Sequence, residues 1–334
     1  MTPDASSRSL TPLDDALALW LEEVRPVATS ERAPQEALGA TLARDVVVEA
    51  DVPARAIARR AGFAVAAADT IGASPYAPAP CLVPPARLAA GEALPTGCDA
   101  ILRDDALSDG PIPEILAEVA PGTDVRRAGE EARAGTLLMP AGHRLRASDV
   151  SVLAALGIDR VAVSRPRVRL DGLALLAPLV AAFGGEVAAA GDADLVLARG
   201  GGGEGETMLV DGLALAPGET THLARDANGM PVARLPALDG DALGAALALL
   251  PPALAALCGA RVPTPLQVRL GEALTSVVGL SEIALLLREG DVWRVLAVGD
   301  LALAAYARAD AYALVPPQAE GYGAGETIEA RPLP

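Results

Sequence analysis

The sequence contains no lysine, so every strongly basic side chain is an arginine. Aromatic residues make up only 2% of the chain although 51% of it is hydrophobic, and we interpret this bias toward alanine, leucine and valine as a habit of the source genome. The three cysteines, Cys81, Cys98 and Cys258, are few, scattered and odd in number. They predict neither a disulfide framework nor a metal site, and such cysteine usage is typical of a reducing compartment.

Positive charge is scarce, since 43 acidic residues oppose 27 basic ones and the net charge is −16. This balance excludes nucleic acid and anionic membrane surfaces as favoured partners, because phosphates would be repelled. The first ten residues do not resemble a secretory signal, so we expect a cytoplasmic protein. An uncharged run over residues 242–260 raises the question of a membrane span, but Pro251 and Pro252 interrupt it. We expect a buried, broken helix there.

A length of 334 residues allows two or more domains with separate cores. Apolar residues at helical spacing, including Leu13, Leu17 and Trp20, predict a helix over residues 10–24. A second helix is expected over residues 35–43. Short apolar runs punctuated by proline and glycine predict a small β-rich domain over residues 57–140.

The second half of the sequence alternates apolar strands and helices. Ser148 is expected to cap a helix that ends at Gly157. Residues 168–260 predict a compact α/β layer, with a helix near 173–183, a strand at 194–198 and a helix from Asp241. From Arg261 onward, apolar segments such as 283–287 and 292–298 predict a terminal β-barrel-like domain.

Residues 122–166 hold glycines, arginines and prolines in a recognisable order. The motifs are Val125-Arg126 with Gly129-Glu130-Glu131, then Pro140-Ala141-Gly142, Leu153-Ala154-Ala155-Leu156-Gly157 and Arg165-Pro166-Arg167-Val168. Upstream, Glu36-Ala37-Leu38-Gly39 leads to Asp51-Val52-Pro53, and Ala307-Arg308-Ala309-Asp310 stands near the end. In these motifs the chain resembles the molybdopterin molybdotransferase family, which includes MoeA and the E domain of gephyrin.

The resemblance implies a multidomain α/β and β fold of four parts. These are a discontinuous helical and extended segment (1–56 and 141–167), a β-rich inserted domain (57–140), a shortened molybdopterin-binding-like α/β domain (168–260) and a β-barrel-like domain (261–334). It also implies a role in molybdenum cofactor biosynthesis, with molybdopterin as substrate or ligand and no other cofactor. A homodimer, or a heterodimer with an intact family member, is the expected assembly.

Several positions to which the family assigns chemistry carry other residues here. The family's catalytic acid falls on Ala61 and a substrate-contacting threonine on Ala90, while two lysines that neutralise oxyanion charge fall on Ala216 and Glu219. A methyl group can neither take a proton nor hold a cation. We therefore predict no catalytic residue and no metal site, and expect molybdate insertion to be impaired or absent.

Ligand contacts are expected from residues that the resemblance retains. The glycine run after the strand at 194–198 supplies Gly200, Gly201, Gly205 and Glu206, in the position of a loop that contacts the pterin phosphate in the family. Pro217 and Gly218 match a second loop, and the best arginine candidates are Arg126 and Arg127, although a structural ion pair with Glu130 or Glu131 is an equal alternative. Asp239 or Asp241 is expected to act as a helix N-cap in place of a phosphate cradle.

Three functions remain open on the sequence alone. The first is binding or delivery of molybdopterin, and the second is a non-catalytic scaffold that pairs with an active paralogue or a molybdoenzyme client. The third is an NAD-type enzyme using Gly200, Gly202 and Gly205 as a dinucleotide fingerprint, which the short following segment and Glu204 and Glu206 disfavour. His143 and His222 are expected to be surface or hydrogen-bonded residues and not metal ligands.

Overall fold

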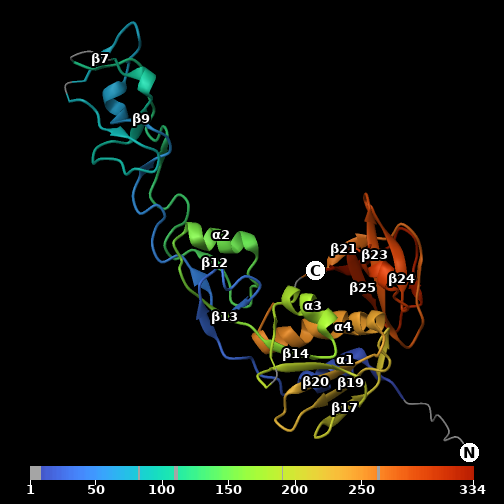
Figure 1. Ribbon diagram of the computed structural model, residues 1–334. Helices are drawn as coiled ribbons and strands as arrows, with labels where there is room; N and C mark the ends of the chain where they lie inside the picture. Colours follow the sequence, from blue (N-terminus) through green and yellow to red (C-terminus); the bar gives the residue numbers. More distant parts are fainter. Residues whose placement is uncertain (1–8, 82, 109–111, 190, 262–263) are drawn as a thin grey trace, which may run out of the picture. The chain divides into compact units, whose positions relative to one another are not determined.

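The computed structural model describes residues 9–81, 83–108, 112–189, 191–261 and 264–334, which fold into two compact units (Figure 1). The first unit comprises Met1–Arg44 and Ala141–Pro334, and the second is Asp45–Pro140. The second unit therefore contains the whole of the expected inserted segment 57–140 together with residues 45–56.

The second unit is built from short strands, as the sequence predicts. Its elements are β4 (Val46–Val47), β5 (Ile57–Ala58), β6 (Gly62–Val65), η1 (Ala67–Thr70), β7 (Ala79–Pro80), β8 (Arg87–Leu88), β9 (Ala100–Leu102), η2 (Asp104–Ala106), β10 (Glu114–Ile115), β11 (Val125–Arg126) and β12 (Leu137–Met139). Strand β6 lies between β8 and β9. The hydrophobic cores of the second unit contain the buried residues Val65, Ile101 and Leu102. Antiparallel pairing of β4 with β12 brings the two ends of the unit together.

A six-stranded sheet in the first unit has the order β15-β14-β16-β20-β19-β17. Strands β15 (Glu186–Val187), β14 (Arg167–Asp171), β16 (Leu195–Arg199) and β20 (Pro231–Leu235) are parallel, whereas β19 (His222–Arg225) and β17 (Thr207–Asp211) run antiparallel to their neighbours. Elements η3 (Ala174–Leu176) and α3 (Ala177–Ala182) form the helical segment expected near 173–183. The central strands β16 and β20 are mostly apolar, and their side chains are buried on both faces of the sheet.

Helix α4 (Asp239–Cys258) packs into the main core through Ala245, Leu247 and Leu250 (Figure 1). It is long and apolar enough to cross a membrane, but 67% of its 18-residue apolar stretch is buried inside the protein. The prediction of burial is confirmed. The predicted break is wrong, since the helix continues through Pro251 and Pro252.

One expectation for residues 9–44 needs correction. Helix α1 (Leu13–Leu21) forms as predicted, with buried Trp20, but residues 34–39 are turns followed by β3 (Thr41–Leu42). The amides of Gly39 and Leu42 donate to carbonyls of residues 143–145, and Gly39 has a φ of 78°, so no helix continues there. Strands β2 (Ser30–Arg32) and β13 (Val161–Ser164) complete this small sheet.

Helix α2 (Ala147–Ala155) begins two residues earlier than a Ser148 cap would place it, because its N-cap is Arg146. The carboxylate of Asp149 accepts the Arg146 backbone N–H at 2.9 Å and closes the first turn. Burial leaves that carboxylate only 8% exposed. Its pKa is held well below the ordinary range by the hydrogen bond from the Arg146 side chain, with a further hydrogen bond from His143.

The C-terminal strands form a closed barrel-like arrangement, as predicted. Strand β23 (Ser281–Glu289) pairs with β24 (Val292–Val298) and β25 (Ala311–Val315), which is followed by β27 (Thr327–Pro332) and β21 (Leu266–Arg269). A parallel bridge between Leu270 and Trp293 returns the order to β24. Strands β1 (Thr11–Pro12) and β18 (Leu213–Ala216) extend the sheet beyond β23, while β22 (Leu274–Thr275) pairs with β26 (Gly321–Tyr322) and α5 (Leu303–Tyr306) precedes β25.

Candidate functional site

The carboxyl ends of β14, β16 and β20 meet at one edge of the six-stranded sheet. Ligands of open α/β sheets bind at this edge, because loops leave the strands there and helices begin. The glycine loop leaves β16 after Arg199, and α4 begins shortly after β20. This edge is the candidate site.

The first part of the glycine loop is open. Gly200 has a φ of 83°, which suits glycine, and added Cβ atoms at Gly200, Gly201 or Gly205 would meet no heavy atom within 4 Å. The space beside these glycines lets a ligand approach the chain closely, although the Gly200 N–H already donates to the Leu235 carbonyl at 3.3 Å. Three predicted site residues lie together here.

Glu206, also predicted as a ligand contact, is engaged inside the loop. Its carboxylate accepts the Gly203 N–H at 2.9 Å and the Arg234 Nη2–H at 2.6 Å. The Glu206 and Arg234 side chains are only 12% and 17% exposed. The Arg234 guanidinium lowers the pKa of Glu206, so this carboxylate stays ionised as the anchor of the loop.

Each arginine of the three strands at this edge already has a carboxylate partner. Arg169 Nε lies 3.1 Å from Asp171 Oδ2, Arg199 pairs with Asp239, and Arg234 pairs with Glu206. Arg199 also donates from Nε to the Gly172 carbonyl at 2.8 Å, which ties the end of β14 to the start of α4. Binding an anionic ligand through these arginines would require one of these pairs to open.

Pro217 and Gly218 follow β18 of the sheet that contains β23 and β25, and they approach α4 from there. A Cβ on Gly244 would lie 2.5 Å from Pro217 Cγ, so the backbone of α4 touches this proline. The Gly218 N–H donates to Glu219 Oε2 at 3.2 Å. The glycine loop, through Arg199, and the Pro217-Gly218 loop therefore both border the first turns of α4.

The start of α4 is acidic. Asp239 and Asp241 lie in its first turn, but the N-cap residue is Leu238 and makes no side-chain cap hydrogen bond, so the expected Asp239 or Asp241 cap is wrong. Burial raises the pKa of Asp241, with contributions from the charges of Glu219 and Asp300. Burial also raises the pKa of Tyr306, whose hydroxyl donates to the Gly240 carbonyl at 2.9 Å. These carboxylates oppose the attraction of a helix N-terminus for anions.

Arg126 and Arg127 belong to the second unit and have structural partners there. Arg126, on β11, forms an ion pair with Glu131, and the Arg127 backbone N–H donates to Glu130 Oε2 at 2.8 Å. The alternative of a structural ion pair is confirmed for Arg126. Ala61 and Ala90 also lie in this unit and are exposed.

The glycine run does not have the context of a dinucleotide fingerprint. The fingerprint requires a helix whose N-terminus receives the pyrophosphate. Here strand β17 follows the run and Gly203 is tied to Glu206. The loop therefore lacks the helix N-terminus that a dinucleotide fingerprint uses.

Histidines and cysteines show no sign of a metal centre. His143 Nε2 lies 2.7 Å from Asp149 Oδ2, which confirms the expected hydrogen-bonded setting for this histidine. His222 Nδ1 lies 2.8 Å from Asp211 Oδ1 but does not meet hydrogen-bond geometry. Across the described ranges, no three His, Cys, Asp or Glu residues are grouped closely enough to hold a metal ion. Cys258 is buried and packs near Thr41.

Sequence reasoning missed the residues that organise this edge, namely Arg199, Arg234, Asp171 and Arg169. A weak signal exists, because Asp171 and Arg199 each end an apolar strand before a glycine. The sequence does not show which carboxylate each arginine meets, since the partners are separated by up to 40 positions in the chain.

A family model described as the MoeA N-terminal region (domain I and II) matches residues 11–157. Among curated proteins, "Molybdopterin molybdenumtransferase 2" of Mycobacterium tuberculosis is 30% identical over 177 residues, which cover 47% of this chain and 41% of that protein. The match thus spans less than half the length of this relative.

Solved structures extend the likeness over nearly the whole chain. A crystal structure of the molybdopterin biosynthesis MoeA protein from Pyrococcus horikoshii OT3 aligns with a TM-score of 0.77 and 25% identity, covering 96% of this chain and 99% of that one. A second structure from Pyrococcus horikoshii aligns with a TM-score of 0.75 and 23% identity, covering 96% and 98%. The folds therefore correspond beyond the region matched by sequence.

Proposed function

Because the chain belongs to the MoeA family, we propose that it acts in molybdenum cofactor biosynthesis or handling by binding molybdopterin at the glycine loop after β16. The observation that carries this proposal is the open space beside Gly200, Gly201 and Gly205, at the carboxyl edge of the parallel strands. Clustered backbone N–H groups can hold a phosphate without lysine. The pterin phosphate is the group that we place there.

Binding is weak in this proposal because the neighbouring charge is negative. The arginines at the edge are paired, and Glu219, Asp239 and Asp241 gather at the start of α4. On a charge-loss estimate with solvent screening, affinity is about 2–4 kcal/mol weaker than in a family member with both lysines.

Calorimetry of the full chain with molybdopterin and its adenylylated form tests the binding proposal. Glu219→Lys reverses the exposed charge that acts on Asp241, so it should strengthen binding by roughly tenfold. Glu329→Lys, an exposed reversal on β27, is the matched control and should leave affinity nearly unchanged. Equal effects of the two reversals, or no measurable binding by Glu219→Lys, would count against a site beside α4.

We also propose that the protein inserts molybdate into adenylylated molybdopterin no faster than background. Ala61, Ala90, Ala216 and Glu219 stand where the family has an acid, a hydroxyl and two cations, and preorganised charges of this kind contribute orders of magnitude per group. A reconstitution assay beside an intact family member measures this. Comparable turnover would contradict the proposal.

The second candidate is a non-catalytic scaffold that pairs with an active paralogue or a molybdoenzyme client. The saturated ion pairs of Arg169, Arg199 and Arg234 favour it, because a scaffold needs no free cation at this edge. Co-purification with an intact family member, combined with no molybdopterin binding even by Glu219→Lys, would support this function over the first.

A further inference from the structure

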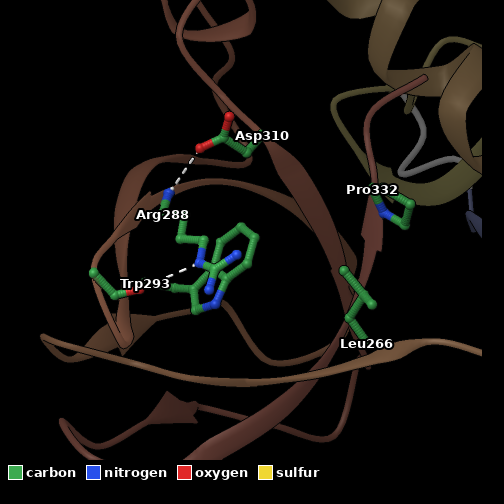
Figure 2. Close-up of a pocket in the computed structure, with 6 residues that line it drawn as sticks. Leu266, Arg288, Trp293, Asp310 and Pro332 are labelled. Atoms are coloured by element: carbon green, nitrogen blue, oxygen red, sulfur yellow. Dashed lines mark hydrogen bonds between the residues drawn. The ribbon is translucent and has the colours of Figure 1, made fainter. Parts of the chain in front are cut away.

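One end of the C-terminal barrel is hollowed into a groove of about 630 Å³ (Figure 2). The start of β21, the β23-β24 hairpin, the start of β25 and the end of β27 meet there. The lining residues are Leu266, Arg288, Gly290, Trp293, Asp310 and Pro332. This barrel-end groove takes no part in the function proposed above.

Arg288 and Trp293 form the floor of the groove. They are directly opposite one another in the β23-β24 register, so their side chains share a face of the hairpin, as Figure 2 shows. Arg288 Nε donates to the Gly290 carbonyl at 3.2 Å. This hydrogen bond restricts the orientation of the guanidinium, and the indole lies on the same face of the hairpin.

The Arg288 guanidinium differs from the arginines of the parallel-sheet edge. No carboxylate among the described residues forms an ion pair with it, although Asp310 is close. The Asp310 carboxylate accepts the Arg288 backbone N–H at 2.9 Å (Figure 2). Glu289, on the same hairpin, lies 3.2 Å from Arg294. The terminal nitrogens of Arg288 are thus left to face an external acceptor.

The walls of the groove are apolar and accessible. Leu266 is 42% exposed, and Pro332 is also exposed on the far side. An open groove with an arginine fork, an aromatic face and aliphatic walls suits an extended chain that alternates acidic and aliphatic side chains. An enclosed small-molecule site would instead surround most of its ligand.

We propose that the barrel-end groove docks an extended peptide segment of a partner protein, with an acidic side chain on Arg288 and an adjacent aliphatic side chain on Trp293 and Leu266. The carboxylate makes a charge-assisted pair with the Arg288 fork. The aliphatic side chain covers the indole and the exposed leucine. The partner is thus a protein with an acidic, aliphatic segment accessible on its surface or in a tail.

A fluorescence titration of the full chain tests the docking. Trp20 is fully buried and contributes a constant background, while Trp293 reports on the groove. The probe is the acetylated and amidated peptide Ala-Leu-Glu-Leu-Ala, and its isostere with Gln in place of Glu is the matched peptide. We expect saturable binding of the Glu peptide with a dissociation constant on the order of 1 mM. The Gln peptide should bind roughly tenfold more weakly.

Two variants locate the contact. Arg288→Gln should weaken binding of the Glu peptide by roughly tenfold and leave the Gln peptide unaffected, whereas Arg294→Gln, on the same hairpin, should leave both unaffected. Sodium acetate at equal concentration should neither bind nor compete. Equal binding of the two peptides, an equal loss in Arg294→Gln, competition by acetate alone or no saturable signal would each overturn the proposal.

Discussion

Ion pairing determines what individual arginines of this lysine-free chain can do. Arg234 is occupied by Glu206 and holds a loop in place, whereas Arg288 keeps its terminal nitrogens accessible on the barrel. The guanidinium is charged at all physiological pH values, so pairing and not titration decides its availability. The same residue type therefore serves structure at one edge and recognition at another.

Asp149 is the side chain whose charge we expect to matter most for local stability. Its folded-state pKa is depressed below the unfolded value of about 3.9, so its contribution is fully present above that pH and is lost as pH falls below it. Asp149→Asn should lower the free energy of unfolding by about 1–3 kcal/mol near neutral pH. Urea unfolding across pH measures the loss, which should shrink below about pH 3.

Asp104→Asn is the control for this prediction. Asp104 pairs with Arg87 at 2.8 Å, but both side chains are largely exposed, so water already solvates the charges. We expect a clearly smaller change in stability than for Asp149→Asn. A loss in Asp149→Asn that persists unchanged in acid would show that packing, and not the ionised carboxylate, stabilises the start of α2.

At the scale of elements, α4 shows how a helix tolerates proline. Pro251 has no N–H to donate to the Leu247 carbonyl, which would be left buried without its helical partner. The Tyr312 hydroxyl, from β25, donates to that carbonyl at 3.3 Å. Burial raises the pKa of Tyr312, so the hydroxyl stays protonated as a donor. The barrel therefore completes a hydrogen bond that the helix lacks.

Tyr312→Phe should lower the free energy of unfolding by about 1–2 kcal/mol, because it leaves the buried Leu247 carbonyl without a donor. In a Pro251→Ala background the new amide can donate to this carbonyl, so the same substitution should cost less than half as much. Denaturant unfolding of the unmodified chain, the two single variants and the double variant gives the coupling free energy between the two positions.

Tyr306→Phe provides the comparison for that cycle. Its hydroxyl donates to Gly240 near the start of α4, where no proline has removed an amide. The cost of Tyr306→Phe should therefore be the same with Pro251 or Ala at that position. If Tyr312→Phe also costs the same in both backgrounds, its hydroxyl does not substitute for the missing amide.

For the whole molecule, the continuous segment Asp45–Pro140 is a unit with its own cores. Pairing of β4 with β12 holds its two ends together, so the unit keeps its own internal contacts when the rest of the chain is removed. We predict that a fragment of residues 45–140 folds alone. A dispersed amide NMR spectrum with cooperative thermal loss is the expected result, and a collapsed spectrum typical of an unfolded chain would contradict it.

Assembly is a second property of the whole molecule, and we propose a dimer on the family resemblance. The apolar residues 243–250 supply no argument for it, because they lie mostly in the core of a single chain. Light scattering at micromolar concentration measures the mass. A strict monomer that becomes a heterodimer on addition of an intact family member would favour the scaffold function.

Local sequence patterns were sufficient for the order of the parts and for the residues at the positions to which the family assigns chemistry. Apolar spacing is local information, so it was sufficient for α1, for β23 and β24, and for the burial of α4. Sequence motifs likewise placed the glycine loop after strand β16. The expected helix over residues 35–43 failed because its amides pair with residues 143–145 from a distant segment.

Which arginine charges remain available depends on long-range contacts. Arg199 meets Asp239, Arg234 meets Glu206, and Arg288 meets no carboxylate among the described residues, yet nothing in the local sequence separates these cases. The hydroxyl that reaches the Leu247 carbonyl of α4 likewise comes from a distant strand, β25. Long-range contacts fix hydrogen-bond and ion-pair partners, and spacing along the chain does not encode them.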